Sequence, residues 1–166
     1  MMKKSLAILL ALVLLLSASC GLAQETPFRT YECAVWVGNA WYELGYNVLS
    51  DFGSNGWTWE QEEDGVFALQ YPGTACYVYA RTIDNTPDTR LVMLDLMWAD
   101  EIKSEYQGFP AGPDAGDDHG LWDFLIREYG AEINEEGTLQ AQISLKLGRT
   151  LLVELKDRAV RLTLEE

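Results

Sequence analysis

The chain has 166 residues, with 12 Lys+Arg against 26 Asp+Glu, a net charge of −14 at pH 7 and 48% hydrophobic residues. This composition is typical of one globular domain with a substantial core. The acidity argues against binding to nucleic acid or anionic lipid, because binding to either relies on Lys and Arg that neutralise phosphates. The simplest reason for the acidity is solubility outside the cell, and the alternative is a docking surface for a cationic partner or divalent cations.

The first 23 residues have the organisation of a secretory signal peptide. A short basic start at residues 3–4 precedes an unbroken apolar run at residues 6–16. The run is too short to remain as a membrane helix, which needs about 20 apolar residues. Small residues follow, and the chain becomes polar at Gln24, so we expect cleavage after Ala23. The mature chain is then residues 24–166, an exported bacterial domain with no transmembrane span.

Cys20 allows a second interpretation of the leader. Residues 17–21, Ser-Ala-Ser-Cys-Gly, resemble a bacterial lipobox, in which the cysteine becomes the acylated first residue of a lipoprotein. They depart from that pattern at Ser17, where leucine or a similar aliphatic residue is usual. Lipidation would anchor the protein at the outer face of the cytoplasmic membrane or at the cell envelope, whereas ordinary cleavage would secrete it.

Export also determines the cysteines that the mature protein keeps. Cys20 is either discarded or acylated, which leaves Cys33 and Cys76. Thiols tend to pair in an oxidising compartment, and closing this loop would stabilise the fold by about 4 kcal/mol through chain entropy. We expect a Cys33–Cys76 disulfide, and the alternative is two buried thiols that pack as small apolar residues.

The N-terminal half is predicted to contain one helix followed by four strands. Residues 31–37 could be a strand or the first turns of that helix. Asn39 is a good N-cap, and the spacing of Trp41 and Leu44 predicts a helix that ends near Ser50. Alternating segments then predict strands, with a hairpin signal at Asp64-Gly65 between the first two, at residues 57–61, 66–71, 74–81 and 90–98.

The C-terminal half gives the clearest pattern. Residues 99–120 are predicted to be a long loop, with one helical turn around Glu101 to Tyr106 as an option, and residues 121–129 a helix. Apolar and polar residues then alternate from Leu139 to Leu164 across two turns, which predicts a three-strand meander with one apolar face that needs a cover. The fold class is therefore α+β, an antiparallel sheet of meanders covered by two helices.

The order of these elements also suggests a duplicated helix-plus-three-strand unit, with repeats at 31–98 and 117–166. Trp41-x-x-Leu44 would open the first helix, and Trp122-x-x-Leu125 would open the second. Each helix would then lead into a meander.

A catalytic thiol would be Cys76, with His119 as its base. Residues 73–77, Gly-Thr-Ala-Cys-Tyr, resemble secreted cysteine peptidases of the cell-wall amidase type, and this likeness implies that Cys76 is the nucleophile. Those enzymes place the cysteine at a helix N-terminus, where the dipole lowers its pKa, whereas residues 77–79 favour a strand here. His119 is the only histidine, which excludes a metal site that needs two. No Gly-x-Ser-x-Gly motif or phosphate-cradling glycine loop occurs, and no cofactor is expected.

Three carboxylates lie in a Gly/Pro-rich stretch ahead of the predicted C-terminal helix. Asp114, Asp117 and Asp118 could supply oxygen ligands to Ca²⁺, but their spacing does not match an EF-hand loop. Asp117 or Asp118 as a helix cap explains the same cluster without a metal.

Aromatic residues recur along the four predicted strands, and most of them are expected to fill the core. If one row faces solvent instead, it could stack on sugar rings or anchor a partner protein. The candidates for such a platform are Trp57, Trp59, Tyr77, Tyr79 and Trp98.

Three hypotheses for function follow. The first is an exported, non-catalytic binding or interaction domain, whose partner is an unknown protein or glycan at the cell envelope. The second is a carbohydrate- or peptidoglycan-binding module that uses the aromatic platform. The third is a cysteine hydrolase with Cys76 and His119.

Export predicts the N-terminus of the mature protein. Chains produced in a bacterial host should begin at Gln24 or at an acylated Cys20, because the leader is removed at one of these positions, and intact-mass spectrometry distinguishes the two. If Cys20 is acylated in the natural chain, Cys20→Ala should release the protein into the medium. If the mature chain begins at Gln24, the same variant should leave it unchanged. A chain that retains Met1 and stays inside the cell would contradict export.

Overall fold

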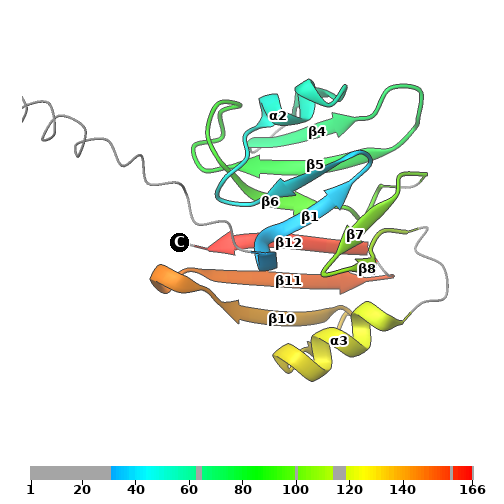
Figure 1. The fold of residues 1–166 in the computed structure, drawn as a ribbon, viewed down its shortest axis with the longest axis vertical. Helices are drawn as coiled ribbons and strands as arrows, with labels where there is room; N and C mark the ends of the chain where they lie inside the picture. Colours follow the sequence, from blue (N-terminus) through cyan, green and yellow to red (C-terminus); the bar gives the residue numbers. More distant parts are fainter. Residues whose placement is uncertain (1–30, 63–64, 100, 114–118, 158, 166) are drawn as a thin grey trace, which may run out of the picture.

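A computed structural model of the chain describes residues 31–62, 65–99, 101–113, 119–157 and 159–165. In this part of the chain, two antiparallel sheets and two α-helices make up the fold, as Figure 1 shows. The larger sheet has eight strands in the order β3-β4-β5-β6-β12-β11-β10-β9, and the smaller has four in the order β2-β1-β7-β8. The predicted α+β class and the mainly antiparallel architecture are therefore confirmed.

The elements have the following bounds. The large sheet contains β3 (Thr58–Gln61), β4 (Val66–Gln70), β5 (Tyr77–Thr82), β6 (Leu91–Asp95), β9 (Glu132–Ile133), β10 (Leu139–Ser144), β11 (Thr150–Lys156) and β12 (Ala159–Glu165). The small sheet contains β1 (Ala34–Val37), β2 (Ala40–Glu43), β7 (Ser104–Tyr106) and β8 (Phe109–Pro110). The helices are α2 (Leu49–Ser54) and α3 (Gly120–Tyr129), with 3₁₀ turns η1 (Tyr31–Cys33) and η3 (Lys146–Gly148).

The C-terminal meander forms as predicted from its alternating pattern. Along β10, Leu139, Ala141 and Ile143 are buried, and the residues between them face away from the core. β12 then pairs with β6, with Leu162 opposite Leu94. This pairing joins the C-terminal meander to β3–β6 in one continuous sheet.

The core lies between one face of the large sheet and a cover made by the small sheet and the helices. Figure 1 shows β1, β7 and β8 crossing over the large sheet, with α3 alongside β10. Val35 from β1, Tyr106 from β7 and Leu125 from α3 are fully buried in one cluster with Leu94 and Leu162. The apolar face of the meander therefore has the cover that the sequence required.

The helix predicted to begin at Asn39 is wrong, because this segment forms β2. Trp41 lies opposite Trp36 across the β1–β2 hairpin, and Gly38 adopts a φ of +65° at its turn. Trp41 is exposed while Tyr42 is buried, since neighbouring side chains of a strand point to opposite faces. Strand pairing outweighs the helical spacing here, and α2 is shorter and begins later.

The long loop expected at residues 99–120 contains β7 and β8. The optional helical turn around Glu101 to Tyr106 is wrong, since Ser104–Tyr106 is extended and pairs with β1. A strand of three residues is too short to show a period in the sequence.

The structure contains no disulfide bond in its described residues, and both Cys33 and Cys76 are buried. Backbone hydrogen bonds connect the Cys33 segment, through Gly45, to Leu91 at the start of β6. The residue after Cys76 instead bonds to Trp98, beyond the end of β6. The strand therefore separates the two cysteines, whereas a disulfide needs Cα atoms within about 7 Å.

The motifs that suggested duplication do not occupy equivalent elements. Trp41-x-x-Leu44 begins on β2, whereas Trp122-x-x-Leu125 lies within α3. This sequence match therefore does not support a repeat.

A stack of aromatic rings holds α2 against the sheets. Tyr42 stacks on Phe52 with ring centroids 3.5 Å apart, and Trp57 meets Phe52 edge-on at 5.6 Å. The Tyr42 hydroxyl is buried close to the side chains of Asn55 and Trp57. Burial raises the pKa of Tyr42 to about 12.

Stability is expected to fall as the pH rises above about 10, the pKa of an unfolded tyrosine. The folded state binds the Tyr42 proton more tightly than the unfolded state does. The contribution of this proton to the free energy of unfolding is therefore complete below about pH 10 and is lost as the pH rises through about 12. Tyr42→Phe should therefore reduce the loss of unfolding free energy over this range by roughly 1–3 kcal/mol. Urea unfolding at pH 8 to 11 measures it, with the exposed Tyr31→Phe as control, and identical pH profiles for wild type and Tyr42→Phe would contradict the prediction.

Candidate functional site

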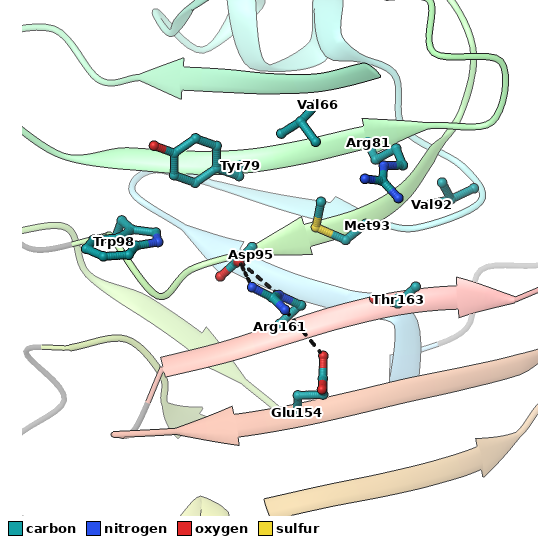
Figure 2. A pocket seen from close by; sticks show the side chains of 10 residues that line it. All are labelled: Val66, Tyr79, Arg81, Val92, Met93, Asp95, Trp98, Glu154, Arg161 and Thr163. Atoms are coloured by element: carbon teal, nitrogen blue, oxygen red, sulfur yellow. Dashed lines mark hydrogen bonds and ion pairs between the residues drawn. The ribbon is translucent and has the colours of Figure 1, made fainter. Parts of the chain in front are cut away.

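A groove of about 530 Å³ lies on the face of the large sheet that points away from the small sheet. Figure 2 views this face, with β1 behind the sheet. The lining residues come from β4, β5, β6, β11 and β12, together with Trp98 just beyond β6. The groove therefore crosses the junction between the two meanders.

The strand register aligns four side chains in one row across the floor of the groove. Tyr79 lies opposite Asp95, Asp95 opposite Arg161, and Arg161 opposite Glu154. Directly opposed residues point to the same face with Cβ atoms about 4.5–5.5 Å apart. Four neighbouring strands thus bring a phenol, two carboxylates and a guanidinium together.

Ion pairs join the charged side chains of this row, in which two carboxylates share one guanidinium, as the dashed lines in Figure 2 show. Arg161 Nε and Nη2 donate to Asp95 Oδ2 at 2.9 and 2.5 Å, and Arg161 Nη1 lies 3.7 Å from Glu154 Oε2. Asp95 Oδ1 accepts from the Met97 backbone N–H at 2.9 Å, and Glu154 Oε1 accepts from Gln140 Nε2 at 2.9 Å. The Asp95 side chain is only 6% exposed. Both carboxylates therefore accept hydrogen bonds from donors within the protein.

Aromatic side chains stand at one end of the groove. Trp98 is 63% exposed, and Tyr77 stacks beside Tyr79 with ring centroids 6.5 Å apart. Figure 2 places Trp98 and Tyr79 at the same end. Burial, followed by the charge of Glu62, raises the pKa of Tyr79. The Tyr79 hydroxyl is therefore protonated at neutral pH and can donate a hydrogen bond.

Arg81 lies at the other end of the groove in Figure 2. The strand register sets Val66 and Met93 on either side of it, and its side chain is exposed. Within the described residues it takes part in no ion pair or side-chain hydrogen bond, in contrast to Arg161. Arg81 is thus a cation of the groove that the described structure does not neutralise.

The predicted five-residue aromatic platform does not form. Trp57 is 3% exposed and packs edge-on against Tyr71. Trp59 packs against the core above α2, where a Cβ on Gly53 would lie 2.8 Å from the Trp59 ring. Both tryptophan side chains point to the inner face of the large sheet, where they pack against α2. Only Tyr77, Tyr79 and Trp98 remain exposed or partly exposed near the groove.

The predicted nucleophile and base lie on different elements. Cys76 is 1% exposed and precedes β5 rather than a helix. His119 is exposed at the N-cap of α3, a helix that packs against β10 and β8. A nucleophile must meet its substrate, and the hydrolase hypothesis stays a prediction.

The remaining predicted sites lie outside the described residues: the leader with Cys20, and the loop with Asp114, Asp117 and Asp118. Within the described residues, no group of three or more His, Cys, Asp or Glu could hold a metal ion. No helix in the same part of the chain has the length and apolar content to cross a membrane.

A second aromatic cluster lies on the small sheet and was not predicted. Trp36 and Trp41 meet edge-on with ring centroids 5.7 Å apart, and Tyr31 lies 6.4 Å from Trp41. Tyr31 and Trp41 are 57% and 45% exposed. The sequence does not predict this cluster, because the helical spacing of Trp41 would not set it opposite Trp36.

Comparison of the chain with known protein families, curated protein sequences and solved structures finds no match.

Removing the guanidinium under the groove should destabilise the fold. Arg161→Met would leave the Asp95 charge buried without its partner, which is costly. Because the Arg161 side chain is 39% exposed, water should offset part of this cost, and we expect a loss of about 1–3 kcal/mol. Urea unfolding followed by tryptophan fluorescence measures the change.

The matched control is Arg127→Met, which removes an exposed ion pair with Glu128. Its effect should be under about 1 kcal/mol. Equal losses in the two variants would show that the Asp95–Arg161 pair has no special role in the fold.

Proposed function

We propose that the protein is an exported, non-catalytic binding domain of the bacterial envelope, with the outer-face groove as its ligand site. The observation that carries the proposal is the exposed Trp98 beside Tyr79 at the edge of this groove. Exposed aromatic side chains next to a concave surface are typical of binding hot spots. The leader at residues 1–23 supports export.

The state of the carboxylates favours binding over catalysis. Each Asp95 oxygen accepts a hydrogen bond from Arg161 or from the Met97 backbone, and Glu154 is bound by Gln140 and Arg161. A general base needs an oxygen that can approach the proton it removes. Both carboxylates instead bind donors within the sheet. They are therefore better suited to form a rigid floor beneath a ligand than to remove a proton.

A carbohydrate- or peptidoglycan-binding module is the second candidate. Sugar rings present a flat apolar face and a polar edge, and the groove offers aromatic rings together with hydroxyl, guanidinium and carboxylate groups. Such sites combine apolar surface with a few well-placed polar groups. Trp98, Tyr79 and Tyr77 would form the stacking surface, in place of Trp57 and Trp59.

An origin by duplication would explain the position of the groove. In the large sheet, β3-β4-β5-β6 is followed by β12-β11-β10-β9, and the small sheet reads β2-β1-β7-β8. These mirrored orders support two copies of a longer unit than the repeats at 31–98 and 117–166, in which the second copy begins at β7 and the copies meet at β6 and β12 under the groove. Superposition of the two copies should place β1 on β7 and α2 on α3, and failure to do so would contradict duplication.

Trp98→Ala and Tyr79→Ala should weaken ligand capture about tenfold or more, because each removes aromatic contact area at the groove. Envelope fractions and soluble peptidoglycan fragments are the probes, read by pull-down and by quenching of tryptophan fluorescence. Trp41→Ala, at the second aromatic cluster, is the matched control and should bind as the wild type does. Retention of a glycan favours the second candidate, and retention of a protein alone favours an interaction domain. Unchanged capture by both groove variants would contradict the site.

A further inference from the structure

One guanidinium of the groove, that of Arg81, has no ion-pair partner among the described residues. Arg161 neutralises Asp95 and approaches Glu154, and the remaining oxygens of these carboxylates accept other hydrogen bonds, as described above. Arg81 has no such partner among the described residues. The lining therefore carries two carboxylates and two guanidiniums, and Arg81 is the one charged side chain among them without an ion-pair partner in the described residues.

The geometry separates this cation from the aromatic rings. Arg81 and Tyr79 are two residues apart on β5 and point to the same face, at a spacing of about 6.6 Å. Trp98 lies at the far side of Tyr79 from Arg81 in Figure 2. A ligand that reaches both Trp98 and Arg81 spans on the order of 10 Å, the length of one or two sugar rings.

The charge of the whole protein limits the size of such an anion. The mature chain keeps 10 Lys+Arg and 26 Asp+Glu, a net charge of −16. This field repels extended polyanions, whereas charges beyond the Debye length of about 8 Å are largely screened from a small ligand inside the groove. One carboxylate at one guanidinium fits these constraints, and the pair can be bidentate.

We propose that the groove binds a small acidic sugar, whose ring stacks on Trp98 and Tyr79 while a single carboxylate pairs with Arg81. This assignment rests on the proposed function of the groove as a ligand site. It adds the chemical class of the ligand and gives Arg81 the role of the specificity-determining residue.

The test compares one sugar with and without its charge. The probes are the disaccharide of N-acetylglucosamine and N-acetylmuramic acid and the methyl ester of the same disaccharide, titrated by calorimetry. The wild type should bind the acid at least tenfold more tightly than the ester. Arg81→Gln should lower the affinity for the acid to that for the ester, and Arg81→Lys should restore part of it.

Arg90→Gln is the matched control, since Arg90 is an exposed arginine outside the groove, and it should leave both affinities unchanged. Equal binding of acid and ester, or an Arg81→Gln variant that keeps the preference, would overturn the inference while leaving the groove as a ligand site. Absence of binding by the wild type would also overturn it. The pull-down with Trp98→Ala then decides the proposed function separately, because it does not depend on any chosen sugar.

Discussion

The pairing of β6 with β12 is the constraint on which the rest of the structure depends. It joins the two meanders, with Leu162 opposite Leu94 on the inner face and Arg161 opposite Asp95 on the outer face. A slip of one residue would turn Arg161 into the core and Leu162 toward water, so both faces enforce the same register. A buried ion pair is a weak source of stability, and its clearer contribution here is to specify this alignment.

The same register builds the groove. Because Asp95 and Glu154 are paired with Arg161 and hydrogen-bonded within the sheet, the features left for a ligand are the aromatic rings at Trp98 and Tyr79 and the guanidinium of Arg81. An aromatic surface next to a floor of paired polar groups suits a compact, partly apolar ligand. Structure and binding surface are thus two consequences of one strand pairing.

The sequence predicts this fold where the pattern is local and fails where contacts are distant. Residues 139–164 alternate clearly and form the expected meander, whereas Trp41 has helical spacing and lies in a strand, because its partner is Trp36 across a tight turn. The Glu154–Arg161 pairing follows from the turn between their strands. Asp95 joins them from 66 residues away, and no local pattern encodes that contact. The groove could therefore be anticipated only in part, through exposed aromatics such as Trp98.

Two exposed aromatic surfaces, one at the groove and one at Trp36 and Trp41, compete for the role of ligand site. Heteronuclear NMR during titration with solubilised envelope glycans resolves them most directly, since each tryptophan has its own indole N–H signal. If the groove is the site, the Trp98 indole and the β5 amides near Tyr79 should shift while the Trp36 and Trp41 signals stay in place. Shifts confined to Trp36 and Trp41 would contradict the assignment of the groove.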